Sequence, residues 1–159
     1  MKKLSLTLEE IFNDNFELIA IYSDEEDYRL AFLLNQYLEL RLQKTDPIIT
    51  THNNEFTVFE YDDRHHYRLW QLIFNHHIRN RKVNRTHDLF SDSTITFDKT
   101  TFFIKKLKKA RFLLKLEAEQ SEAYYRNIVN KISNIPQVYA CDIISLDRIN
   151  DKEFKKLLF

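Results

Sequence analysis

The sequence contains no glycine, a single cysteine and no long apolar run. Without glycine, the chain cannot build the glycine-rich loops that cradle phosphates or the glycine-flanked turn that presents a nucleophilic serine. One cysteine, Cys141, excludes an internal disulfide and a thiolate metal cluster. No segment approaches the ~20 apolar residues of a membrane span, and residues 1–6 lack a signal peptide's apolar segment. We therefore expect a cytoplasmic protein.

The composition is otherwise that of an ordinary globular domain. Of the 159 residues, 43% are hydrophobic and 30% are charged, which is close to the average for folded domains. A chain of this length normally forms one domain with a core of its own. The aromatic residues, which include 13 phenylalanines and eight tyrosines, are expected mostly in that core, and those on predicted strands include Phe56, Phe59, Trp70, Phe74, Phe112 and Tyr139.

The formal net charge is zero, but the charges are unevenly distributed. Residues 64–116 hold 13 basic and three acidic side chains, whereas the other 106 residues hold 11 basic and 21 acidic ones. Residues 9–27 contain eight carboxylates and no cation. Such asymmetry is informative about binding partners rather than about fold.

Apolar periodicity predicts two helices and five strands. Ser23 and Glu26 form a capping box that predicts the start of the first helix, and Ser121 predicts the cap of the second. Asp62 and Asp63 are expected in the turn of a central hairpin. The predicted helices span about 24–42 and 121–132, and the strands span 16–22, 55–61, 67–74, 112–116 and 138–144.

These elements predict a single α+β domain over residues 1–159. The expected fold is a mainly antiparallel sheet of about five strands with two helices on one face, in a ferredoxin-like β-α-β-β-β-α-β order. Residues 75–93 show no usable periodicity, residues 94–97 are a candidate short strand, and the stretch 76–101 is interpreted as a long basic connection. The tail, residues 147–159, ends on apolar side chains and is expected to dock on the domain or on a neighbour.

Several landmarks resemble the IPExxxVDY family, small proteins of the Bacteroidota. The resemblance rests on the start at residues 2–6, on the run Asp27-Tyr28-Arg29-Leu30-Ala31-Phe32-Leu33-Leu34-Asn35, and on the order of residues 56–62 and 72–75. Residues 104–116 occupy the place of the name-giving motif, but it is substituted. The family's proline and glutamate fall on Lys105 and Lys106, and its valine, aspartate and tyrosine on Ala110, Arg111 and Phe112. The resemblance implies a cytoplasmic bacterial domain and carries no catalytic residues.

Three groups of residues suggest chemistry, and each has a structural alternative. His65, His66, His76, His77 and His87 offer imidazoles for a metal, but neighbours on a strand point to opposite faces and no helical spacing unites them. Asp62 and Asp63 beside His65 and His66 supply acid–base side chains in a turn that collects aspartate for backbone reasons. Cys141 lies in an apolar strand and is interpreted as buried filler. We expect neither an enzyme, nor a cofactor, nor a metal.

The basic segment is the strongest functional signal. The candidate binding residues are Arg79, Arg81, Lys82, Arg85, Lys105, Lys106, Lys108, Lys109 and Arg111. They are interpreted as a solvated or internally paired face, as a surface for a protein partner or a second copy, or as a phosphate-binding surface. The sequence thus predicts a non-enzymatic binding or adaptor domain acting through protein contacts. The alternative is RNA or single-stranded nucleic-acid binding through residues 79–111.

Overall fold

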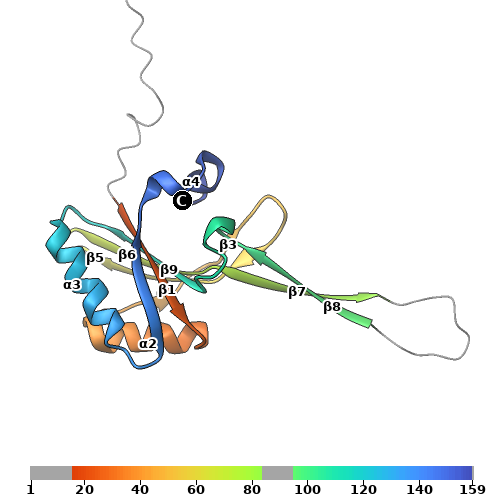
Figure 1. Cartoon of the computed structure of the whole chain (residues 1–159), viewed down its shortest axis with the longest axis horizontal. Helices are drawn as coiled ribbons and strands as arrows, with labels where there is room; N and C mark the ends of the chain where they lie inside the picture. The colour runs from red at the N-terminus through yellow and green to blue at the C-terminus, as the bar shows by residue number, and fades with distance from the viewer. Residues whose placement is uncertain (1–15, 84–94, 159) are drawn as a thin grey trace, which may run out of the picture.

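A computed structural model describes residues 16–83 and 95–158 (Figure 1). The elements follow in this order: β1 (Phe16–Ser23), α2 (Asp27–Leu38), β2 (Gln43–Lys44), β3 (Ile48–Ile49), β4 (Glu55–Phe56), β5 (Val58–Asp63), β6 (Arg68–Phe74), β7 (His76–Val83), β8 (Ile95–Phe102), the 3-10 turn η1 (Lys105–Leu107), β9 (Phe112–Glu117), α3 (Glu122–Ser133), β10 (Val138–Ile144), the 3-10 turn η2 (Leu146–Arg148) and α4 (Asp151–Lys156).

The main sheet has six strands in the order β10-β1-β9-β6-β5-β2. Every ladder in it is antiparallel. The predicted α+β fold with a mainly antiparallel sheet is therefore confirmed. The strand count differs from the expected five because the short β2 pairs with β5 and extends that edge, and further short strands lengthen the expected element order.

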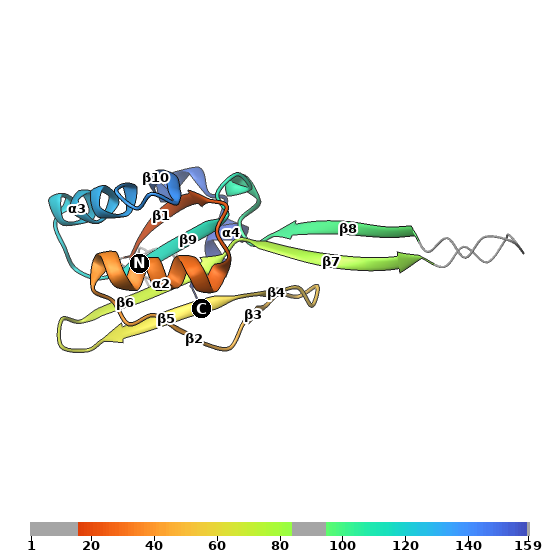
Figure 2. The same cartoon turned by 90° about the horizontal axis from the view of Figure 1, so that it is seen from below.

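Helices α2 and α3 cover one face of this sheet (Figure 2). Their apolar stripes, Leu30, Ala31, Leu33 and Leu34 on α2 with Tyr125, Ile128 and Ile132 on α3, share one core cluster with alternate residues of β1 and β9. Because the spacing of 3.6 residues per turn places these side chains on one side of each helix, the sequence pattern dictates this layer. The expectation of two helices on one face is confirmed.

The opposite face is covered by the segments around η1 and by the C-terminal part of the chain. A second core cluster there joins Leu18 and Leu113 of the sheet to Phe103, Ile104 and Leu157. Leu157 has no exposed surface, so the tail is docked on its own domain, and it contains a third helix, α4. Phe159 lies outside the described residues.

The predicted long connection at residues 76–101 is wrong. Residues His76–Val83 and Ile95–Phe102 form a two-stranded antiparallel ribbon that projects from the body (Figures 1 and 2). We call this ribbon, β7 with β8, the arm. A strand shows apolar alternation only when one of its faces is buried. Because the arm stands away from the core, it has no buried face, and its sequence lacks the apolar alternation that predicts a strand.

Two local predictions are also wrong. Ser23 does not cap α2: it is buried at the end of β1, where its hydroxyl donates to the Gln137 carbonyl at 2.8 Å and accepts from the Glu25 N–H. The unusual backbone angle of the hairpin turn, a positive φ of 54°, falls on Tyr67 and not on the aspartates, although the Asp63 carbonyl accepts from the His66 N–H at 3.2 Å. The Ser121 cap is confirmed, since its hydroxyl accepts from the Tyr124 N–H.

Candidate functional site

A buried asparagine fixes the root of the arm. Asn75, between β6 and β7, has no exposed surface, and its side-chain amide donates to the carbonyls of Leu107 (2.9 Å) and Ala110 (3.0 Å). Its side-chain oxygen accepts from the Ile104 N–H at 2.8 Å. These bonds tie the start of β7 to the lysine-bearing loop around η1. These hydrogen bonds therefore hold the arm and the loop together where both leave the body.

The paired histidines of β7 have structural partners. The ring of His76 packs between Phe74 and Phe102, and its Nε2 donates to the Lys108 carbonyl at 3.1 Å. Burial lowers the pKa of His76, the bond to Lys108 opposes that shift, and nearby Arg111 adds to it. His77 meets the edge of Phe56 instead. Each ring is thus occupied in packing at the arm root.

The predicted basic residues divide into two sets. Arg79 is exposed on β7 directly opposite Lys99 of β8, so the arm carries a cross-strand pair of cations. Arg81 and Lys82 lie further along β7, but their side chains are outside the described part of the structure, as is Arg85 altogether. Lys105, Lys108 and Lys109 are exposed in the loop at the arm root.

Some cations of the basic segment are engaged within the molecule. Lys106 donates to the Arg148 carbonyl at 3.0 Å, and Arg111 donates to the Asp24 carbonyl at 3.2 Å while covering the Phe74 ring. Lys115 is buried and lies 2.6 Å from a Glu117 oxygen. Hence only part of the sequence's positive charge is presented to a partner.

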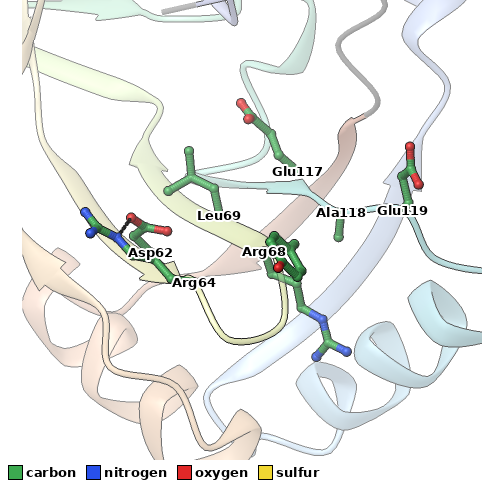
Figure 3. A pocket seen from close by; sticks show the side chains of 8 residues that line it. Asp62, Arg64, Arg68, Leu69, Glu117, Ala118 and Glu119 are labelled. Atoms are coloured by element: carbon green, nitrogen blue, oxygen red, sulfur yellow. Dashed lines mark hydrogen bonds and ion pairs between the residues drawn. The ribbon is translucent and has the colours of Figure 1, made fainter.

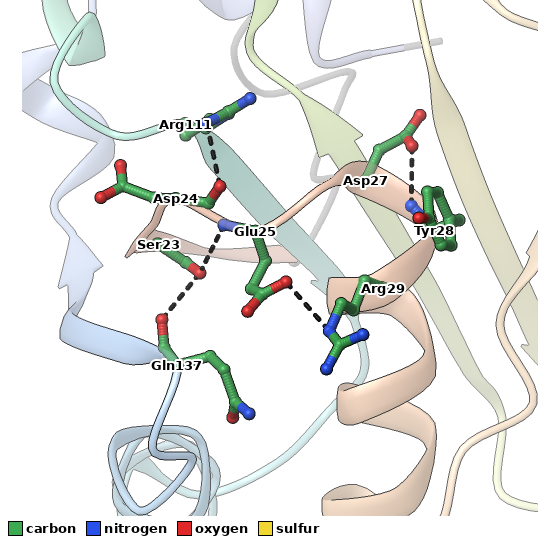
Figure 4. Close-up of polar contacts among 8 residues, drawn as sticks. All are labelled: Ser23, Asp24, Glu25, Asp27, Tyr28, Arg29, Arg111 and Gln137. Carbon is green, nitrogen blue, oxygen red and sulfur yellow. Dashed lines mark hydrogen bonds and ion pairs between the residues drawn. The ribbon is translucent and has the colours of Figure 1, made fainter.

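Acidic and aromatic residues lie near the arm root, where Figure 4 shows Arg111 donating to the Asp24 carbonyl. Asp24 accepts from the Tyr139 hydroxyl at 3.2 Å, and Glu26 is exposed at the start of α2. Tyr28, Phe32 and Tyr139 are 66%, 63% and 66% exposed. We call Asp24, Glu26, Tyr28, Phe32 and Tyr139 the acidic–aromatic surface.

The sequence analysis missed this surface and misplaced Tyr139. Phe56, Phe59, Trp70 and Phe112 are buried as expected and Phe74 is partly buried, but Tyr139 on the edge strand β10 is exposed. The available signal was on α2. Tyr28 and Phe32 are four residues apart and so share a helix face, and both lie off the buried stripe.

Of the two aspartates proposed for acid–base chemistry, Asp62 lines an open depression of about 520 Å³ (Figure 3). Asp62 pairs with Arg64 at 2.8 Å, and Asp63 contacts the His66 ring nitrogen Nδ1 at 2.8 Å. Both carboxylates are thus engaged by neighbours on their own hairpin. The geometry favours the structural interpretation of these residues.

Cys141 is buried, as expected for a core residue. Only 8% of it is exposed. Burial, with a smaller contribution from the Asp142 carboxylate, raises the pKa of its thiol to about 12. The thiolate required of a nucleophile is therefore strongly disfavoured at neutral pH.

Within residues 16–83 and 95–158, no three His, Cys, Asp or Glu side chains gather closely enough to hold a metal ion. The helices in those ranges are all too short or too polar to cross a membrane. The chain matches no protein-family model, and no curated protein or solved structure is significantly similar to it. The resemblance to the IPExxxVDY family therefore stays a prediction.

Proposed function

We propose that this is a non-enzymatic binding protein that acts through protein contacts, with the arm as its binding element. The observation that carries the proposal is the arm itself. In the described residues, its two eight-residue strands pair with each other and with no third strand. A lone two-stranded ribbon is only marginally stable in water, so a partner that covers it contributes much of its order.

The exposed side chains of the arm support contact with a protein. Ile78 is 57% exposed, and the backbone groups along both outer edges of the ribbon are available to pair with another strand. The site of action that we propose is the cytoplasm, because that compartment keeps free cysteines such as the buried Cys141 reduced.

Nucleic-acid binding is the second candidate. Arg79 and Lys99 face solvent as a pair, and Lys105, Lys108 and Lys109 lie exposed at the arm root. Such cations attract phosphates. We place this function second because Lys106 and Arg111, two residues of the predicted patch, donate to backbone carbonyls of the body.

Site-specific photo-cross-linking tests the proposed function. A photoreactive phenylalanine analogue replaces Ile78 on the arm or, as the control, Lys131 on the exposed side of α3. Both variants are irradiated inside the cells that produce the protein. We expect a discrete protein adduct from position 78 and little or none from position 131. Adducts of equal yield from both positions, or none from the arm, contradict the proposal.

The same experiment separates the second candidate. A nuclease-sensitive adduct at position 78 indicates RNA or DNA on the arm, whereas a nuclease-resistant adduct of fixed mass indicates a protein. For the nucleic-acid function, affinity for a labelled single strand must fall steeply with added salt and be lost on charge reversal at Lys105, Lys106 and Lys108. No binding at low salt excludes it.

A further inference from the structure

We infer that the partner of the arm is a second copy of this chain, and that two copies exchange arms. Each arm lies against the acidic–aromatic surface beside the root of the other arm. This inference rests on the proposed function of the arm and adds the identity of its partner. Four observations lead to it.

The first observation is the position of the acidic–aromatic surface. Arg111 bonds to the backbone of Asp24, and its guanidinium covers Phe74 at the end of β6. The Arg111 carbonyl in turn accepts from the N–H of Asn75, the residue before β7. A short chain of contacts therefore joins this surface to the arm root.

The second observation is charge complementarity. Residues 24–27 are four consecutive acids at the start of α2, whereas β7 carries Arg79, Arg81 and Lys82 and no acid. One of the four, Glu25, is paired with Arg29 of α2. Opposite charges on two surfaces of the same chain favour association between copies and steer the encounter.

The third observation is the set of exposed aromatic rings. Tyr28, Phe32 and Tyr139 each leave more than half of their surface in water. Aromatic side chains of this kind are the usual anchors of protein interfaces, and a guanidinium such as that of Arg79 stacks well on them. The acidic carboxylates and the rings together suit a basic β-ribbon.

The fourth observation is the length and symmetry of the arm. Arg79 lies three residues, or ~10 Å, beyond His76, so two arms that run antiparallel with Arg79 of each beside His76 of the other bring this cation to the partner's root. A two-fold axis between residues 77 and 78 of the two arms then uses the same two surfaces twice, which is the isologous arrangement of most homodimers. The free ribbon edges pair across that axis.

A charge-swap experiment tests arm exchange with the full chain. In one variant the arm is reversed by Arg79→Glu and Lys99→Glu. In the other the surface is reversed by Asp24→Lys and Glu26→Lys. The control, Lys131→Glu with Lys152→Glu, makes the same charge change as the arm variant at exposed positions on α3 and α4. Sedimentation equilibrium gives the mass, and circular dichroism confirms that each variant folds.

Arm exchange predicts a wild-type dimer weakened by salt, an equally dimeric control, and two reversed variants that are each monomeric. An equimolar mixture of the two reversed variants must form a dimer, because each arm then meets a surface of opposite charge. A monomeric wild type at high concentration overturns the inference, and so does a dimer that survives arm reversal. Arm-specific cross-linking to a different protein would leave the proposed function standing while this inference falls.

Discussion

Asn75 shows how one side chain can position an entire element. Its side-chain amide and oxygen supply hydrogen-bond partners for backbone groups of Ile104, Leu107 and Ala110 inside the protein. Polar groups left unsatisfied in a buried site are costly, so this residue stabilises more than its size suggests.

We predict that Asn75→Ala lowers the free energy of unfolding by about 2–4 kcal/mol, because it strands several buried backbone groups without partners. Urea denaturation followed by circular dichroism measures this loss. The control is Asn127→Ala on the exposed side of α3, for which a change within about 0.5 kcal/mol is expected. Equal stability of the two variants would show that the Asn75 contacts do not hold the arm root.

Glu17 provides a second test at the scale of a single residue, through the effect of its pKa on stability. Burial and, to a smaller extent, the Glu122 carboxylate raise its pKa. Ionisation of Glu17 is therefore less favourable in the folded chain than in the unfolded chain. The fold is disfavoured by this group above the folded-state pKa, and the penalty disappears below the unfolded-state pKa, where both states are protonated.

The expected result is that Glu17→Gln stabilises the protein at pH 7 and that its advantage over the wild type vanishes as the pH falls below about 4. Urea midpoints measured at several pH values provide the comparison. The exposed Glu55→Gln serves as the control and should show no comparable pH-dependent gain. A variant that is less stable at pH 7 would mean that the Glu17 carboxylate makes favourable contacts.

Among the elements, α4 holds the lysine-bearing loop around η1 against the body. Glu153 accepts from the Lys105 N–H at 2.7 Å, Lys156 donates to the Phe103 carbonyl at 3.0 Å, and Leu157 fills the core beneath them. The arm root thus depends on the C-terminal segment as well as on Asn75.

Leu157→Ala should therefore reduce stability by about 2–4 kcal/mol, through lost burial and the cavity left behind. It should also accelerate amide hydrogen exchange at residues 104–110, measured by mass spectrometry. Lys155→Ala, on the exposed side of α4, is the matched control. Unchanged exchange in the loop would show that α4 does not brace it.

Elements that bury a face were predictable from the sequence, and elements that bury none were not. The stripe of Leu30, Ala31 and Leu34 identified α2, and the apolar runs identified β1 and β9. The arm has no such stripe, and its residues read as a loop. The basic residues were predicted as one group, but sequence spacing could not show that Lys106 and Arg111 bond back to the body.

At the scale of the whole molecule, the balanced charge conceals two complementary parts. The basic arm, the basic loop around η1 and the acidic residues at the start of α2 lie at the same end of the body. Arg111 and Asp24 connect them through a hydrogen bond. The acidic–aromatic surface escaped prediction because its residues come from the start of α2 and from β10, and these two elements are 100 residues apart in sequence. Their juxtaposition follows only from the β1–β10 ladder.

The central claim is that the arm is the surface through which this protein binds, and that a second copy occupies it. Hydrogen exchange of the arm amides at high and low protein concentration tests this claim most directly. If two copies cover each other's arms, amides in 77–82 and 96–101 are protected at high concentration and lose about tenfold or more of that protection on dilution, while β1 and β9 stay unchanged. Arm amides that exchange equally fast at both concentrations would contradict the account.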